Sequence, residues 1–382
     1  MKAIINGKII TKDNIIENKI LVFDNKIIGI TDSLPNEDIE VIDAKGLYVS
    51  PGLIDIHIHG NKGYDTMTAS KKELSLMSES IASTGVTSYL ATTMTMDTKI
   101  IEDRLNTLRE YINQDKSNGA KIIGVHLEGP FLNERYCGAQ DPKFIVGPSF
   151  DMINKHSDII KVITYAPEKD LNFEFTKYIK NNTDIVLSMG HTSASYEEAV
   201  EAIKHGASNA THLFNAMSGL NHRNPGVVGA SIINNVKCEI IADGIHTHTD
   251  IFKFLLKTKN MEDIILVTDA IEATGLSDGI YSLGGQPIEV KDNSARLVSN
   301  GALAGSTAKL NCMVKNFIKH TNLDIVQSIN LASINPAVSI GIDDKKGSIE
   351  IGKDADIAIF DEELNCHMTI VEGNIKFKNG IL

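Results

Sequence analysis

The sequence predicts an α/β fold: a (β/α)8 TIM-like barrel with a small β-sandwich domain built from both chain ends. Short apolar runs alternate with turn residues at both termini, and eight longer apolar runs alternate with amphipathic stretches between them. The chain of 382 residues is 42% hydrophobic, which is enough for a large core. An open doubly wound sheet is the alternative, but no G-x-G-x-x-G or Walker A motif follows any run.

Residues 1–50 and 346–382 are expected to form the two parts of the sandwich. Their apolar runs are separated by Asn-Gly, Asp-Asn and Glu-Gly-Asn turns, which are typical of hairpins. Neither end is long enough to bury a good core alone, so a shared domain is the simplest arrangement. The expected strands are Ala3–Ile5, Lys8–Ile10, Lys19–Phe23, Lys26–Ile30, Ile357–Phe360, Met368–Val371 and Ile375–Phe377.

Residues 51–345 are expected to form the barrel. Amphipathic patterns separate most of its apolar runs, as in residues 195–205, where Gly206 marks the helix end. Eight such β/α units indicate a closed barrel. The expected strands are Leu53–His57, Thr87–Thr92, Ile122–Glu128, Ile159–Tyr165, Ile185–His191, Ser208–Leu213, Cys238–Asp243 and Ile264–Asp269.

Charge and cysteine content exclude several classes of protein. The formal charge of −12 argues against a nucleic-acid or anionic-membrane partner. No segment approaches 18 consecutive apolar residues, and the N-terminus reads as a strand rather than a signal peptide. The four cysteines are scattered without a C-x-x-C pair, so neither a disulfide framework nor a thiolate metal site is expected. We therefore expect a cytoplasmic protein.

Histidines and carboxylates stand at the ends of the expected barrel strands. Because these ends meet at one mouth of a barrel, the side chains should lie together. His57 and His59 are two residues apart on an extended chain, so both project to the same side and suit one metal. His191 and His212 could bind a second metal, and Glu128 could bridge the two.

A set of imidazole and carboxylate donors without thiolate fits one or two divalent metal ions. We favour Zn²⁺ or Fe²⁺ as the metal, and Mn²⁺ and Co²⁺ are the further candidates. A single histidine at a strand end is more often a core or surface residue than a metal ligand, but histidines at several strand ends together favour a metal centre. His126 should lie deeper, as core or as support for a ligand. Asp269 is a helix N-cap, a third carboxylate ligand or a general base that returns a proton to a leaving amine, and we favour the base.

Several motifs resemble the N-acetylglucosamine-6-phosphate deacetylases of the amidohydrolase superfamily. The most specific are H-L-E-G-P-F at residues 126–131 and T-H-L-F-N-A-M at 211–217, whereas H-x-H at 57–59 and K-G-x-I at 346–349 occur across the superfamily. The resemblance runs from about residue 1 to residue 380. It implies hydrolysis of the N-acetyl group of N-acetylglucosamine 6-phosphate to glucosamine 6-phosphate and acetate, in amino sugar catabolism.

The resemblance also implies residue roles. Glu128, His191 and His212 match metal ligands, Asp269 matches the catalytic acid/base, and His246 matches a residue that polarises the acetyl carbonyl. The residues that match substrate contacts, besides His246, are Ala139, Gln140, Asn215, Ala216, Leu303, Ala304 and Gly305, the last three in a loop that closes over the sugar. Arg223 matches an arginine that reaches the phosphate from the neighbouring subunit of a homodimer.

Two departures from the family pattern bear on these roles. Some members carry Gln and Asn in place of His57 and His59 and use a single metal. This chain has both histidines, so it allows a second metal. Cys137 and Gln140 stand where some members have a basic residue and His. The alternatives are an N-acetylgalactosamine-6-phosphate deacetylase, another amidohydrolase such as an adenine deaminase or a cyclic amidase, and a catalytically silent scaffold on the same fold.

Overall fold

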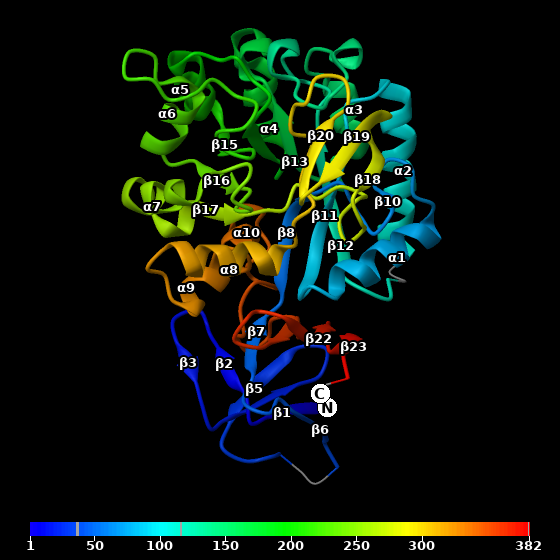
Figure 1. Cartoon of the computed structure of the whole chain (residues 1–382), viewed down its shortest axis with the longest axis vertical. Helices are drawn as coiled ribbons and strands as arrows, with labels where there is room; N and C mark the ends of the chain where they lie inside the picture. The colour runs from blue at the N-terminus through cyan, green and yellow to red at the C-terminus, as the bar shows by residue number, and fades with distance from the viewer. Residues whose placement is uncertain (36–37, 115–116, 381) are drawn as a thin grey trace.

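The computed structural model describes residues 1–35, 38–114, 117–380 and 382. It confirms the predicted fold class: a barrel of parallel strands and helices stands above a β-sandwich that holds both termini (Figure 1). In this part of the chain the barrel sheet comprises β8 (Leu53–Ile58), β11 (Val86–Thr92), β12 (Lys121–Glu128), β13 (Ile160–Tyr165), β14 (Val186–Met189), β15 (Ala207–Ala210), β16 (Lys237–Ile240) and β17 (Ile264–Leu266).

The barrel strands lie in sequence order, each parallel to the next. The first and last strands meet only near their carboxyl ends, where Asp269 donates its backbone N–H to the carbonyl oxygen of His57 over 2.8 Å. Deeper in the barrel both strands instead donate backbone hydrogen bonds to an inserted segment: Leu266, at the end of β17, to Leu331 over 2.9 Å, and Ile54, near the start of β8, to Ala332 over 2.8 Å. The barrel is therefore closed at the mouth and opened at the base by an inserted segment.

Helices cover the outside of the barrel. All residues of β8 and β11 are buried, which explains why these strands read as continuous apolar runs. Ser195 and Glu198 form a capping box at the start of one helix, and Gly206 ends that helix with φ +136°, as the sequence indicates. The helices are α1 (Lys71–Ala82), α2 (Thr98–Gln114), α3 (Phe150–His156), α4 (Glu174–Asn182), α5 (Tyr196–His205), α6 (Gly226–Ile233), α7 (Thr249–Thr258), α8 (Leu310–His320), α9 (Ile325–Asn330) and α10 (Ile334–Ser339).

The strands β14 to β17 end two or three residues earlier than the sequence predicts. His191, His212 and Asp269, which were expected within or at the ends of strands, have φ angles of +47°, +31° and +49°. A left-handed residue cannot continue an extended strand, so the chain turns sharply at each of these positions. These side chains are therefore presented by turns at the barrel mouth rather than by the strands themselves.

The sandwich contains two sheets. One is ordered β5-β4-β1-β6 and the other β23-β22-β21-β7-β2-β3, so the second sheet joins strands from both ends of the chain. At its centre β7 pairs parallel with β2 and antiparallel with β21. The strands are β1 (Lys2–Ile5), β2 (Lys8–Ile10), β3 (Ile15–Ile16), β4 (Ile20–Phe23), β5 (Ile27–Thr31), β6 (Glu40–Asp43), β7 (Tyr48–Pro51), β21 (Ile357–Phe360), β22 (Cys366–Val371) and β23 (Asn374–Lys378). The boundaries of the two units at residues 50/51 and 345/346 stay a prediction.

A small antiparallel sheet, which the sequence analysis did not predict, follows the last barrel strand. It consists of β18 (Gly279–Leu283), β19 (Gln286–Lys291) and β20 (Ser294–Leu297), drawn in yellow beside the upper part of the barrel (Figure 1). A second pair, β9 (Gly60–Asn61) and β10 (Tyr64–Asp65), follows β8. Both additions follow the carboxyl ends of barrel strands, and Leu283 of β18 lines the cavity at the mouth of the barrel.

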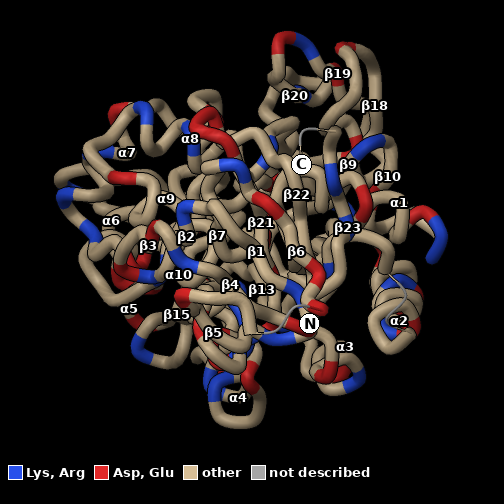
Figure 2. The backbone as a smooth tube through the Cα atoms, turned by 90° about the horizontal axis from the view of Figure 1, so that it is seen from below, with Lys and Arg blue, Asp and Glu red and all other residues tan. Residues whose placement is uncertain are grey.

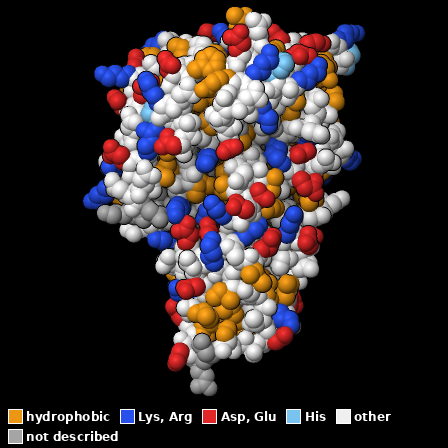
Figure 3. Space-filling model, turned by 180° about the vertical axis from the view of Figure 1, so that it is seen from behind, with side chains coloured by type: hydrophobic (Ala, Val, Ile, Leu, Met, Phe, Trp, Pro, Cys, Tyr) orange, Lys and Arg blue, Asp and Glu red, His pale blue; other side chains and the backbone are white. Residues whose placement is uncertain are grey.

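Charges of both signs are distributed over the surface. Basic and acidic positions are interspersed around the tube seen from below (Figure 2), and acidic and basic side chains alternate over the face in Figure 3. Among the described residues no helix is both long enough and apolar enough to cross a membrane.

A buried ion-pair cluster lies where the barrel joins the sandwich. The Nζ atom of Lys346 lies 2.7 Å from Asp356 and 3.0 Å from Asp354. Burial opposes the charge of Lys346, but these two carboxylates raise its pKa above the usual range. Glu372, 3.8 Å from Lys346, is also paired at 2.8 Å with Lys121 of the barrel strand β12. The cluster therefore connects the return of the chain into the sandwich with the barrel.

We expect Lys346→Met to lower the free energy of unfolding by about 3–5 kcal/mol, because removing one partner leaves buried carboxylates uncompensated. The measurement is equilibrium urea denaturation. Lys315→Met is the matched control: Lys315 pairs with Glu363 at 2.6 Å, but both side chains are exposed, so only a small fraction of that loss is expected. Equal losses in the two variants would contradict a special role for the buried cluster.

Candidate active site

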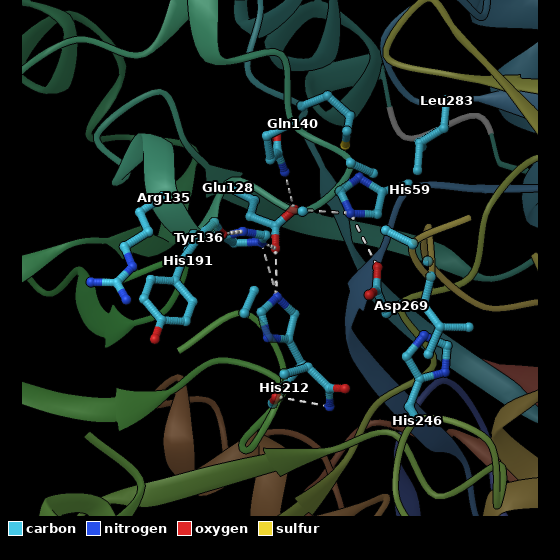
Figure 4. Close-up of a pocket in the computed structure, with 18 residues that line it drawn as sticks. His59, Glu128, Arg135, Tyr136, Gln140, His191, His212, His246, Asp269 and Leu283 are labelled. Carbon is cyan, nitrogen blue, oxygen red and sulfur yellow. Dashed lines mark hydrogen bonds and ion pairs between the residues drawn. The ribbon is translucent and has the colours of Figure 1, made fainter. Parts of the chain in front are cut away.

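A cavity of about 330 Å³ opens at the mouth of the barrel. It lies in the size range of small-molecule sites. The predicted site residues that line it are His59, Glu128, Ala139, Gln140, His191, His212, Asn215, Ala216, His246, Asp269, Leu303 and Gly305. In the close-up, Glu128 lies at the centre, with Arg135 and Tyr136 on one side and Asp269 and His246 on the other (Figure 4).

Glu128, His191 and His212 form one candidate metal-binding triad. The Nε2 atoms of both histidines lie 3.2 Å from Oε1 of Glu128 and 3.1 Å from each other. Zinc bonds of about 2.0–2.1 Å in a tetrahedron place donor atoms about 3.3 Å apart. The three donor atoms are thus spaced to surround one divalent ion.

His57, His59 and Asp269 form a second triad on the other side of Glu128. The Nε2 atoms of His57 and His59 lie 3.6 and 3.3 Å from Oδ1 of Asp269. They lie 3.3 and 3.2 Å from the Oε1 and Oε2 atoms of Glu128, respectively. Glu128 is therefore shared by both triads, which is the position of a bridging ligand.

Hydrogen bonds behind the rings direct their lone pairs into the site. Nδ1 of His191 lies 2.9 Å from the carbonyl oxygen of Tyr136, which can only accept, so Nδ1 carries the proton and Nε2 faces Glu128 with its lone pair. Nδ1 of His57 lies 3.0 Å from the carboxylate of Glu239, which also accepts hydrogen bonds. Nδ1 of His57 therefore carries the proton, and Nε2 presents its lone pair to the site. Nε2 of His57 is buried without a hydrogen bond to any described residue. This donor set fits a divalent cation.

The carboxylates and imidazoles perturb one another strongly. Burial opposes protonation of His59, but hydrogen bonds and charges from Asp269 and Glu128 raise its pKa to about 9. Burial opposes ionisation of Asp269, but His57 and His59 lower its pKa to about 2. Burial also opposes ionisation of Glu128, but the rings of His57, His191 and His212 hold its pKa well below the usual range. A divalent cation would replace these ring protons, so its uptake would release protons.

Two polar side chains support the ligands from within the fold. Gln140 donates from Nε2 to Oε2 of Glu128 over 2.7 Å, and its Oε1 accepts the backbone N–H of Thr95 at 2.6 Å. Asp55 accepts a hydrogen bond from the hydroxyl of Thr268, next to Asp269, over 2.6 Å, and burial raises the pKa of Asp55 to about 7. Gln140 thus lines the cavity and also restrains Glu128.

The loop at residues 303–306 packs directly against Asp269. Ser306 donates its backbone N–H to the carbonyl oxygen of Asp269 over 2.7 Å. Gly305 has φ +57°, and a Cβ atom there would lie 2.9 Å from that carbonyl oxygen and 2.5 Å from Cγ2 of Ile271. Only glycine allows this close approach. Leu303 and Gly305 line the cavity, whereas Ala304 is fully buried.

His246 faces the cavity with one ring nitrogen. Its Nδ1 lies 2.7 Å from Oδ2 of Asp243, and its backbone N–H donates to Oδ1 of the same carboxylate over 2.8 Å. Asn215 donates from its side chain to the carbonyl oxygen of His212 over 3.2 Å, and Ala216 has φ +49°. Asn215 and Ala216 therefore lie at the two histidine turns, whereas His246 lies on the side of Asp269 (Figure 4).

Arg223 and Arg135 differ in their position relative to the cavity. Arg223 is exposed in the turn at residues 221–224 and is not among the residues that line the cavity, so its predicted contact across a dimer stays a prediction. Arg135 lines the cavity, and sequence reasoning missed it. The signal was its scarcity, since the chain has only five arginines and this one follows a metal-ligand motif.

Glu239 and Asp55 were also missed. Both are single carboxylates within apolar runs, and both are buried. A charged residue in the middle of a buried strand is unfavourable unless it has a partner, and this was the signal that could have found them.

Comparison with known proteins agrees with this geometry. The sequence model described as "Amidohydrolase family" matches residues 48–380. The chain is 39% identical over 379 residues to the N-acetylglucosamine-6-phosphate deacetylase of Bacillus subtilis (strain 168), covering 97% of this chain and 95% of the relative. It is 29% identical to the N-acetylgalactosamine-6-phosphate deacetylase of Escherichia coli O157:H7, covering 96% and 97%. The crystal structure of N-acetylglucosamine-6-phosphate deacetylase from Pasteurella multocida matches with a TM-score of 0.92 and 32% identity, over 99% of this chain and 100% of that one.

We expect the protein after gentle purification to contain about two divalent ions per chain, because Glu128 is shared by two complete donor triads. The double variant His57→Asn/His59→Asn should contain about one ion and keep some activity, since the other triad is intact. The measurement is elemental analysis of protein with verified concentration. His222→Asn/His248→Asn, at two exposed positions, serves as the control. One tightly bound ion in the unmodified protein, with no effect of the double change, would rule out the binuclear centre.

Proposed function

The chain belongs to the amidohydrolase family, and we propose that it hydrolyses the N-acetyl group of N-acetylglucosamine 6-phosphate, releasing glucosamine 6-phosphate and acetate in amino sugar catabolism. The observation that carries this proposal is the shared carboxylate Glu128, with imidazoles on both sides and Asp269 and His246 at the same cavity. The names of the related proteins support the choice of substrate.

The residues proposed to hold metal are Glu128, His191 and His212 for one ion and His57, His59 and Asp269, with Glu128, for a second. Zn²⁺ or Fe²⁺ is our first choice, with Mn²⁺ and Co²⁺ as alternatives. A bound divalent cation polarises an amide carbonyl and makes water a better nucleophile at neutral pH. The remaining requirements of the reaction fall to side chains of this protein.

Amide hydrolysis needs a group that moves a proton. Water oxygen forms a bond to the acetyl carbon, the bond from that carbon to the sugar nitrogen breaks, and the nitrogen leaves as an amine after accepting a proton. Asp269 is placed to take the proton from the attacking water and deliver it to the nitrogen, because its carboxylate lines the cavity beside the ligands and is ionised. His246, held by Asp243, is placed to stabilise the carbonyl oxygen as negative charge develops there.

The phosphate needs positive charge in a protein whose net charge is −12. Neither guanidinium group of Arg135 and Arg223 forms a hydrogen bond or ion pair with any other residue that the structure describes, so both are available to an anion. We assign Arg135 to the phosphate site of its own subunit and Arg223 to that of the partner subunit in a homodimer. The support is the place of Arg135 in the cavity wall and the exposure of Arg223.

The N-acetylgalactosamine epimer is the second candidate substrate, because one relative of similar length is named for it. The two sugars differ at one hydroxyl group. A cytoplasmic location is supported by the four cysteines, which all lie in the described ranges and are free thiols. We propose no nucleic-acid or membrane partner.

The proposed function is tested by the release of acetate from N-acetylglucosamine 6-phosphate by metal-loaded protein. Asp269→Asn should lower kcat and kcat/KM together by about 10²–10⁴, because the proton transfer belongs to the transition state. Because the amide oxygen of Asn can still contact a metal ion, the variant should keep folding and most of its metal. Asp250→Asn, at an exposed position, is the control. Loss of metal as severe as the loss of rate would make Asp269 chiefly a ligand, and no acetate release by the unmodified protein would refute the function.

We expect Arg135→Ala and Arg223→Ala each to lower kcat/KM for the phosphorylated sugar by roughly 30- to 1000-fold, the effect of losing a charge-assisted contact in a site closed from water. Hydrolysis of unphosphorylated N-acetylglucosamine, which cannot use the contact, should be slow and little changed. Arg135→Lys, which keeps the charge but not the planar fork, should recover part of the loss. Equal losses on both sugars would show that the arginine supports the fold.

Mixed dimers separate the two arginines. Combining Arg223→Ala chains with Asp269→Asn chains should partly restore activity, because the site with intact Asp269 then receives Arg223 from its partner. Combining Arg135→Ala with Asp269→Asn chains should restore nothing, because Arg135 serves its own site. No recovery in verified Arg223→Ala/Asp269→Asn dimers would place Arg223 in its own subunit's site.

A further inference from the structure

A fully buried carboxylate lies behind the metal-binding histidines, outside the cavity. Glu239 is on the barrel strand β16, and its side chain is shielded from solvent. Its Oε2 atom lies 3.0 Å from Nδ1 of His57 and 3.3 Å from the backbone nitrogen of His212. Its Oε1 atom has no hydrogen-bond partner among the described residues. Since a buried charge is unfavourable without partners, these two contacts are what compensate Glu239.

The cluster of His57, His126 and Glu239 has the spacing of a third metal site, but its hydrogen bonds exclude that role. Nδ1 of His126 lies 2.9 Å from the carbonyl oxygen of Ile56, and Nε2 lies 2.7 Å from the hydroxyl of Thr164. Both nitrogens of His126 are therefore occupied by protein groups. Glu239 is left to act on His57 and on the turn that carries His212.

One oxygen atom of Glu239 thus contacts a ligand from each triad. By accepting a hydrogen bond from Nδ1–H of His57, it fixes the tautomer in which Nε2 offers its lone pair to the site. That Nε2 atom lies 3.3 Å from Glu128 and 3.6 Å from Asp269. By accepting the backbone N–H of His212 it restrains the residue whose φ angle of +31° presents the imidazole to Glu128. The second contact lies at the position where the chain leaves strand β15.

We propose that Glu239 is a positioning residue that couples the two metal triads, setting the affinity of His57, His59 and Asp269 for a divalent cation and aligning His212 in the other triad. The proposal rests on the metal centre assigned under the proposed function and not on the identity of the substrate. Glu239 does not line the cavity, so it acts through His57 and His212.

The test compares Glu239→Gln, which keeps an oxygen acceptor without the charge, with Glu239→Met, which removes both. Metal-free protein is titrated with Zn²⁺ alone against a competing chelator, and bound metal is counted by elemental analysis. In Glu239→Met the weaker ion should bind about 10- to 100-fold less tightly, the usual effect of losing a group that orients a ligand. Glu239→Gln should fall between Glu239→Met and the unmodified protein.

Asp170→Asn is the matched control. Asp170 is also a buried carboxylate that accepts backbone hydrogen bonds, from Phe175 at 3.0 Å and Thr176 at 2.8 Å, but it caps α4 away from the cavity. This variant should lower thermal stability and leave zinc affinity unchanged. If Glu239→Met does not fold by circular dichroism, the zinc affinity of Glu239→Gln decides.

Three results would overturn the proposal: unmodified protein that saturates at one ion, Glu239 variants that bind two ions with unchanged affinity, or an equal loss of zinc affinity in Asp170→Asn. Failure of the proposed substrate is a separate outcome. If the unmodified protein releases no acetate while the Glu239 variants lose zinc affinity as expected, the coupling stands and the substrate assignment falls.

Discussion

The negative charge of Glu128, buried at the mouth of the barrel, is the constraint on which the site depends. Ring nitrogens of His57, His59, His191 and His212 lie within 3.3 Å of its two carboxylate oxygens. Burying an ionised carboxylate without partners is unfavourable by several kcal/mol. The surrounding strands must therefore deliver either protonated rings or rings that share a cation with it, and the second arrangement provides the chemistry of the family.

Delivering four rings to one carboxylate requires sharp turns, and the turns need support. Three of the residues beside Glu128 or in contact with its ligands have left-handed backbone conformations, each unfavourable by about 1–3 kcal/mol in general. Acceptors nearby hold two of them in place: the carbonyl oxygen of Tyr136 accepts a hydrogen bond from the ring of His191, and the carboxylate of Glu239 accepts one from the backbone N–H of His212. The need to hold these turns explains why a polar side chain such as Glu239 is buried in a barrel strand.

The sequence predicts the barrel and the gathering of histidines well, because parallel strands have one common direction and their carboxyl ends share one side of the sheet. It overextends the later strands: no glycine marks the turns at His212 and Asp269, and the Gly190 that precedes the turn at His191 lies inside the expected strand Ile185–His191. It misses the sheet after β17 although Gly284-Gly285 is a typical two-residue hairpin turn between β18 and β19. These strands are short and half-exposed, so their apolar content is weak.

Some site residues can be predicted from the order of the strands, whereas others depend on how loops and distant strands pack. The candidate metal ligands at strand ends could be predicted to lie together because their position along the chain determines where they lie. Arg135 is not found in this way, because its place in the cavity wall depends on how the loop after Glu128 folds back over the mouth. Glu239 is not found because only the three-dimensional structure shows that its neighbour across the barrel is the back of a ligand ring.

The central strand pair of the sandwich also determines the order in which the molecule can assemble. Tyr48 of β7 pairs with Phe360 of β21, so the intervening barrel sequence must be synthesised before this contact can form. Contacts between residues so distant in sequence form slowly, and apolar strand faces that await a partner are prone to aggregate. During translation the barrel strands can pair with their neighbours as they emerge, while the N-terminal strands wait for the last part of the chain. The joining of the two ends is therefore a late step in folding, and the nascent chain is most vulnerable to misassembly until it occurs.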